Sequence, residues 1–138
     1  MSDPNQDGLD PLCARDCEQH LRAGGVGILA LVGSPAPILR PVNFALHGRW
    51  LLVRTGEGRI FEAAQRAEPA SFVVSEVDRF EHTGWSVVVS GKLAARESDA
   101  SLLRVALRPW ARADKHHFVA LSMDEISGRR LATEGPIP

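Results

Sequence analysis

The sequence has no excess of charge, no long apolar run and almost no cysteine. Its 138 residues carry a formal net charge of -1, so no global field attracts nucleic acid or an anionic membrane surface. The apolar runs Val26–Val32 and Trp85–Gly91 are much shorter than the roughly 20 residues that a membrane-spanning helix needs. The sequence therefore predicts neither a nucleic-acid-binding protein nor a membrane protein.

Signals for export and for metal binding are also absent. Residues 1–10 are acidic and polar and lack the basic start and apolar stretch of a secretory signal, so we expect a flexible leader on a cytoplasmic protein. Cys13 and Cys17 are the only cysteines, and their spacing on a helix does not suit a disulfide. His20 continues that helix face, but a structural zinc site needs a fourth ligand and no second paired cluster occurs. We predict no metal site.

The sequence lacks the usual groups of side-chain catalysis. No serine stands in a nucleophile-elbow sequence, and no pair of acids is flanked by apolar residues as a general acid and base tend to be. His116 and His117 are neighbours, so on a strand they point to opposite faces. Redox chemistry would therefore have to come from a bound cofactor.

The chain is expected to form one domain, residues 11–133, between the leader and a tail at residues 134–138. Hydrophobic residues make up 44% and charged residues 24%, as in an ordinary globular protein. About seven strands joined by short connections predict a mainly β fold, a small closed or split barrel that begins as an antiparallel meander. The expected helices are Pro11–Ala23, Arg59–Ala67 and Ala100–Leu107, and the expected strands are Val26–Val32, Ile38–Leu46, Trp50–Thr55, Ser71–Val77, Trp85–Arg96, His117–Leu121 and Glu125–Leu131.

A candidate phosphate site follows the third expected strand. Arg54, Thr55 and Arg59 flank a glycine-rich turn before a helix start, which offers positive donors, a hydroxyl and backbone N–H groups. The alternative is an edge strand that ends in a solvated arginine and a flexible turn. If the preceding strand pairs across a tight turn, Arg40 lies near the level of Thr55, and Asn43 either presents its amide to a heterocycle or faces solvent.

Six segments follow one another in a distinctive order: LRAGGVGILAL, RPVNFAL, LLVRTGEGRIFEAA, FVVSEVD, TGWSVVVSGKL and ISGRRL. In this combination they resemble the pyridoxamine 5'-phosphate oxidase-like flavoproteins with the FMN-binding split-barrel fold, in particular a small uncharacterised bacterial branch. The resemblance runs from about Cys17 to Leu131. It implies a homodimer of split barrels with two FMN molecules bound in the grooves between the subunits.

The resemblance also implies which residues contact the cofactor. Four consecutive residues of the second strand would line the isoalloxazine, partly through backbone groups: Arg40, Pro41, Val42 and Asn43. Arg54 and Thr55 would reach the ribityl chain and phosphate, with help from Arg59. Trp85 and Ser86 would lie near the flavin, contributed by the same or the partner subunit; otherwise Trp85 is core or interface bulk.

Two departures from the family pattern matter. Relatives usually carry a phosphate-binding lysine where this chain has Ile60, so Arg54 or Arg59 would have to replace it. Losing one charge-assisted hydrogen bond costs about 1.5–3 kcal/mol, roughly a factor of ten to a hundred in binding. The C-terminal extension whose arginines hold the substrate phosphate in true pyridoxamine phosphate oxidases has no counterpart here, so we do not expect vitamin B6 oxidation.

The expected function is that of an FMN-dependent oxidoreductase, which transfers hydride or electrons between a reduced nucleotide and an unknown small acceptor. One alternative is a deazaflavin-dependent reductase on the same fold, since a different cofactor would account for the missing lysine. A non-catalytic flavin- or haem-binding module is another, in which His82, His116 or His117 would have to serve the iron.

Overall fold

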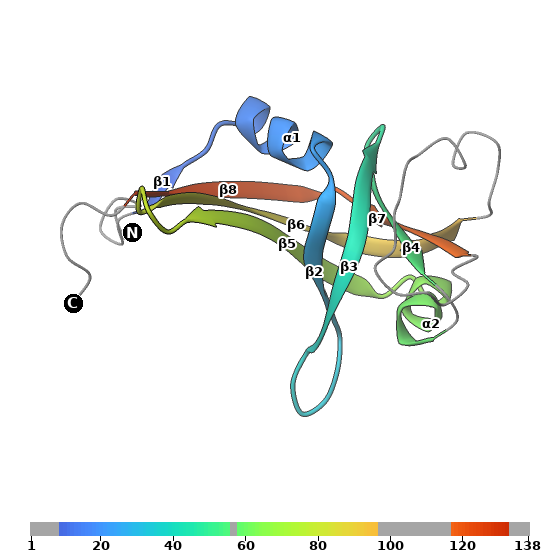
Figure 1. The fold of residues 1–138 in the computed structure, drawn as a ribbon. Coiled ribbons are helices and arrows are strands. Elements are labelled where there is room, and N and C mark those ends of the chain that lie inside the picture. Colours follow the sequence, from blue (N-terminus) through green and yellow to red (C-terminus); the bar gives the residue numbers. More distant parts are fainter. Residues whose placement is uncertain (1–8, 56–57, 97–116, 133–138) are drawn as a thin grey trace.

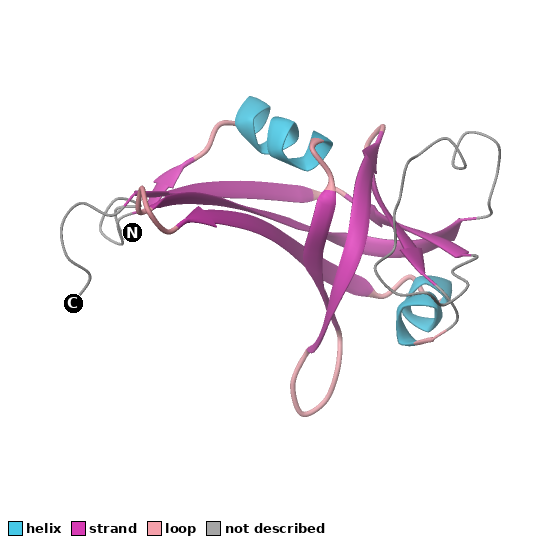
Figure 2. Ribbon diagram, in the orientation of Figure 1, coloured by secondary structure: helices cyan, strands magenta, loops and turns pink. Residues whose placement is uncertain are grey.

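The computed structural model describes residues 9–55, 58–96 and 117–132, which form eight strands and two helices (Figures 1 and 2). Strands dominate this part of the chain, and the helices lie at its margins. The elements in chain order are β1 Leu9–Pro11, α1 Ala14–Arg22, β2 Gly25–Leu31, β3 Ile38–His47, β4 Trp50–Thr55, α2 Arg59–Gln65, β5 Pro69–Asp78, β6 Thr83–Arg96, β7 His117–Ser122 and β8 Glu125–Ala132.

Six antiparallel strands close into a barrel. They follow the order β6-β5-β2-β3-β4-β7, and β7 pairs again with β6. The 14-residue β6 pairs with β5 along much of its length, whereas its first part pairs with β8 and its last part with β7. The sheet therefore continues past the barrel as β5, β6 and β8, which run out together in Figure 1, with β1 on the edge of β8.

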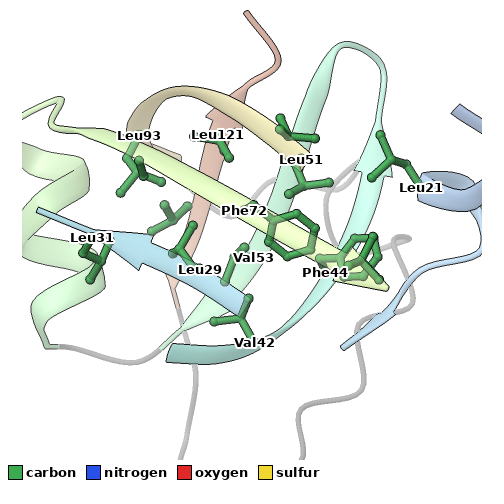
Figure 3. Packing of buried hydrophobic residues seen from close by; sticks show 14 of the residues in the cluster. Leu21, Leu29, Leu31, Val42, Phe44, Leu51, Val53, Phe72, Leu93 and Leu121 are labelled. Carbon is green, nitrogen blue, oxygen red and sulfur yellow. The ribbon is translucent and has the colours of Figure 1, made fainter. Parts of the chain in front are cut away.

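The core fills the barrel and extends under α1. Strand β2 buries Leu29 and Leu31 and exposes Val26 and Ile28, the alternation expected of a strand with one face in the core. Phe44 and Phe72 meet edge to face with ring centroids 4.8 Å apart. Figure 3 shows the packed side chains, which come from β2, β3, β4, β5, β6, β7 and α1. Helix α1 closes one side of this core.

A close approach between β6 and β7 requires glycine at position 91. A Cβ atom at Gly91 would meet the backbone carbonyl and the hydroxyl of Ser122. The Ser122 hydroxyl accepts a hydrogen bond from the Lys92 backbone N–H at 2.9 Å, which fixes the end of β7 against β6. Gly91 thus permits the contact that closes the barrel.

The mainly β split-barrel fold is confirmed, and the expected strands from Val26 onward lie within about two residues of β2 to β8 at each end. The meander is limited to β2, β3 and β4, because α2 then carries the chain across to pair β5 with β2. The expected helix Ala100–Leu107 and His116 lie outside the described residues. Neither helix in the described ranges has the length and apolarity needed to cross a membrane.

The expected start of the first helix is wrong. Residues 9–11, which include the end of the expected leader, form β1 against β8, and the helix begins at Ala14 with Cys13 at its N-cap. Cys13 makes no side-chain capping hydrogen bond. The physical reason is the free edge of β8, which pairs with β1 and whose Gly128 carbonyl accepts a hydrogen bond from Leu12 N–H at 3.0 Å.

Candidate functional site

Arg59 is held by contacts within the chain. Its Nη1 donates to Glu68 Oε2 at 2.9 Å, and its Nη2 donates to Glu68 Oε1 at 3.2 Å and to the Val32 carbonyl at 3.0 Å. The hydrogen bonds from Arg59 lower the pKa of the Glu68 carboxyl and raise the pKa of the arginine itself. Arg59, expected to help bind phosphate, therefore joins α2 to the ends of β2 and β5.

Arg54 and Thr55 end β4, where each is half-buried. They face Phe118 and His117 across the β4–β7 ladder. Because successive strand residues point to opposite faces, the guanidinium and the hydroxyl leave the sheet on different sides. The two side chains therefore do not point to one phosphate. Arg54 is the phosphate candidate of this pair, at the α2 end of the barrel.

Arg40 lies farther from Thr55 along the strands than expected. The β3–β4 ladder runs from His47 opposite Trp50 to Phe44 opposite Val53. Continuing this register would place Arg40 two residues beyond the level of Thr55. The Arg40 side chain is exposed, donates to the Leu39 carbonyl at 3.1 Å, and shares no partner with Arg59 among the described residues.

Val42 packs in the core beside Leu29 and Val53 (Figure 3), so its contact with a ligand would have to come from its backbone. Its neighbours Pro41 and Asn43 point to the opposite side of β3. Pro41 is paired with Ile28, and Asn43 with Val26.

Pro41 and Asn43 belong to a surface on the outside of four adjacent strands. Ile28 is also paired with Val73, which is paired with Val88, so an apolar row crosses β3, β2, β5 and β6. Ser86 lies on the same side of β6 as Val88, two residues before it. We call this surface the outer face; it consists of Val26, Ile28, Pro41, Asn43, Val73, Ser86 and Val88.

The outer face exposes apolar side chains beside polar ones. Val26 is 40% exposed, and Ile28 and Val88 are each 36% exposed. Asn43 and Ser86 are half-buried and add an amide and a hydroxyl. The outer face is therefore a candidate surface for packing against a ligand or another protein.

Trp85 lies on the other side of β6 from Ser86, under α1. Its ring stacks on the His20 ring with centroids 3.7 Å apart and planes at 16°. Beside this stack is a depression of about 560 Å³ between α1 and strands β5, β6 and β8. We call it the Trp85 pocket; it is lined by Leu12, Asp16, Gln19, His20, Glu76, Asp78, Thr83, Gly84, Trp85 and Arg130.

The Trp85 pocket and the Arg59 ion pair lie far apart in one chain. The Glu68 carbonyl accepts a hydrogen bond from Leu93 N–H at 3.0 Å, so the ion pair is near the end of β6. Trp85 is eight residues earlier on that strand, a separation of roughly 25 Å at the usual rise per residue. Within one chain, Trp85 and the Arg59 ion pair therefore lie toward opposite ends of β6.

Ile60 and the two cysteines are the remaining positions of interest in the sequence. Ile60, which replaces the lysine of the family pattern, packs against the main core. Cys17 is buried, and burial raises the pKa of its thiol, whereas Cys13 is exposed. In the ranges that the structure describes, no three His, Cys, Asp or Glu residues gather to hold a metal ion.

Sequence reasoning missed the Trp85 pocket as a unit. The sequence indicates Trp85 as a residue near the flavin or in the core, and His20 only as a possible metal ligand. The two residues are 65 positions apart, and no local pattern indicates that α1 folds over β6 to stack them.

The chain is similar to flavin-binding proteins of known structure. An FAD-binding protein from Mycobacterium smegmatis superposes with a TM-score of 0.76 at 28% identity, covering 91% of this chain and 100% of that one. An FAD-binding protein from Mesorhizobium loti gives a TM-score of 0.72 at 25% identity, covering 91% of this chain and 98% of that one.

Sequence comparison identifies the family of the chain. An uncharacterized protein of Mycobacterium tuberculosis is 34% identical over 97 residues, which cover 67% of this chain and 84% of that protein. The family model for pyridoxamine 5'-phosphate oxidase matches residues 14–130, which include α1, the whole barrel and most of β8. The chain therefore belongs to the pyridoxamine 5'-phosphate oxidase family.

Proposed function

We propose that this protein binds a flavin nucleotide, FMN, between two copies of the chain and acts as an oxidoreductase between a reduced nucleotide and a small acceptor. The observation that carries the proposal is the outer face, an exposed apolar row flanked by Asn43 and Ser86. The FAD-binding proteins with the same fold support its coarser part, flavin binding.

The outer face suits a flat ring system. Ile28, Val73 and Val88 offer an apolar surface across three paired strands, and Asn43 at its margin has an amide that can both donate and accept hydrogen bonds. An isoalloxazine ring has the matching combination of an apolar body and a polar pyrimidine edge. When bound, the flavin would supply the hydride and electron transfer that the side chains lack.

Arg54 is the principal candidate for the anionic tail of the nucleotide. Arg59 already donates to Glu68 and Val32, so binding phosphate would require it to give up these contacts. Thr55 leaves the sheet on the other side from Arg54, so its hydroxyl is not assigned to the same phosphate. In this proposal Arg54 takes the role that the lysine fills in relatives.

A second copy of the chain would complete the site. The outer face exposes apolar side chains of β2 and β6 that association would remove from water. Trp85 faces the opposite side of β6 from Ser86 and stacks on His20, so it lies outside this proposed flavin site.

The absorption spectrum of the freshly purified protein, with mass spectrometry of any released small molecule, tests the proposal first. Titration of the stripped protein with FMN, FAD and the deazaflavin cofactor then ranks the three ligands. Tightest binding of FMN supports the proposal, and a preference for FAD would keep flavin binding while correcting the cofactor. Absence of both bound and added flavin would refute it.

Catalysis needs a separate measurement. We expect the flavin-loaded protein to be reduced by a reduced nicotinamide nucleotide and reoxidised by a small acceptor over repeated cycles, followed in the visible absorption of the flavin. Flavin binding without any reduction would favour a non-catalytic flavin-binding module.

A further inference from the structure

We propose that the Trp85 pocket is a second binding site, specific for a planar aromatic cation. The pocket is formed by described residues of one chain, and its volume of about 560 Å³ suits a small ligand. The proposal goes beyond the flavin function and holds whether or not flavin binds at the outer face.

Three strands place the main groups of the pocket in one row. Glu76 on β5 is paired with Trp85, and Trp85 is paired with Arg130 on β8, so the three side chains leave the sheet on the same side. Helix α1 contributes Asp16 and His20, four residues apart and therefore neighbours on the helix surface. An aromatic surface is thus bordered by charged groups from both the sheet and the helix.

The aromatic surface is a preformed stack. His20 lies on Trp85 at 3.7 Å, and both side chains are half-buried. Trp85 also packs against the main core, which fixes the position of its ring. A planar ligand can extend this stack, since heteroaromatic rings stack on tryptophan at similar spacing.

The charge of the pocket selects the sign of the ligand. Three carboxylates, Asp16, Glu76 and Asp78, face one guanidinium, Arg130, which leaves a formal charge of -2 with His20 neutral. Asp78 already accepts hydrogen bonds from two backbone N–H groups of the β5–β6 turn, at 3.0 and 3.1 Å. Asp16 and Glu76 form no ion pair with another residue of the described ranges.

A cation on the face of tryptophan gains from the ring quadrupole as well as from nearby carboxylates. A phosphate or carboxylate ligand would instead be repelled by the net charge. Arg130 adds a donor for a carbonyl group on the ligand. The Trp85 pocket is therefore opposite in charge to the region of Arg40 and Arg54, and its ligand differs in class from the flavin nucleotide.

Three probes with the same ring and different charge test the proposal by isothermal titration or NMR: 1-methylnicotinamide, nicotinamide and nicotinate. We expect saturable binding of the cation, at least about three-fold weaker binding of the neutral amide and none of the anion. Raising the ionic strength from about 0.01 to 0.15 M shortens the Debye length from about 30 to about 8 Å and should weaken cation binding. Equal binding of nicotinate, or no saturable binding of the cation, would overturn the proposal.

Variants assign the binding to the pocket. The double substitution Asp16→Asn and Glu76→Gln should weaken cation binding by roughly three- to ten-fold, because it removes two partly screened attractions. Glu18→Gln is the matched control on the same helix, since Glu18 is exposed, pairs with Arg22 and lies outside the pocket. Equal effects of the control and the double variant would contradict the assignment.

Trp85→Leu should abolish cation binding. Because Trp85 also packs against the core, circular dichroism must show that this variant is folded; if it is not, His20→Ala takes its place and should weaken binding by removing half of the stack. Unchanged binding in a folded variant would refute the role of the stack. FMN titration of the double carboxylate variant separates the two proposals, since failure of flavin binding leaves the cation result standing.

Discussion

Replacing Arg54 by alanine should weaken flavin binding while leaving the barrel folded. Arg54, the last residue but one of β4, follows the fully buried Val53 and is the arginine of the α2 end that we assign to the anionic tail. Removing a charge-assisted hydrogen bond costs about 1.5–3 kcal/mol, which is roughly a ten- to hundred-fold loss of affinity. Because Arg54 is only half-buried, solvent screening places the expected loss toward the lower end of that range.

Arg59 gives a comparison at the same end of the barrel. Arg59→Ala removes a guanidinium that already contacts Glu68 and Val32, so we expect a lower Tm and little change in flavin affinity. Arg49→Ala serves as the control for loss of a positive charge, since Arg49 is exposed in the β3–β4 turn at the opposite end of β4.

Titration of each stripped variant with FMN, followed by the quenching of flavin fluorescence, measures the affinity. Thermal unfolding of the same samples measures stability. Unchanged affinity in folded Arg54→Ala, or a larger loss in Arg59→Ala, would refute the assignment of the phosphate to Arg54.

Three further predictions concern stability and association. Gly91→Ala should destabilise the protein by about 3 kcal/mol or more in denaturant unfolding, because the new methyl group meets the Ser122 carbonyl; a loss below about 1 kcal/mol would contradict the observed approach. Val88→Arg should convert a dimer into a folded monomer, measured by light scattering after gel filtration, and a variant that stays dimeric would exclude this face as the interface. Glu68→Gln should lose stability at neutral pH. Since Arg59 lowers the folded-state pKa of Glu68, the difference from the parent protein should be complete above the ordinary value of 4.5 and vanish as the pH falls through the lowered pKa; a difference that persists in acid would contradict this linkage.

The strands of the barrel could be predicted because their signals are local. Strand β4 has the bounds expected from its apolar residues, which stand in the sequence between Gly48 and Gly56. Strand β1 could not be predicted, since its sequence, Leu9-Asp10-Pro11, has no strand pattern and owes its conformation to the open edge of β8. Local sequence describes what a segment can form, and edge pairing depends on a partner far along the chain.

In the candidate site, too, local sequence indicates which residues are candidates, whereas their surroundings depend on distant parts of the chain. Sequence motifs indicate Arg54 and Trp85 as candidates, but motifs do not report which side of a sheet a residue faces or what already binds it. Arg59 is engaged by Glu68 nine residues away, across a helix, and the register of β3 moves Arg40 beyond the expected level. These facts arise from tertiary contacts and register, where a shift of one residue reverses the face of every side chain.

Sedimentation velocity with detection in both the protein band and the visible flavin band tests the shared flavin site most directly. We predict that flavin added to the stripped protein sediments with a species of twice the mass of the chain, at one flavin per chain. The Val88→Arg variant should sediment as a monomer without bound flavin. Flavin that sediments with a monomer, or that remains free in the presence of the dimer, would contradict a site completed by two subunits.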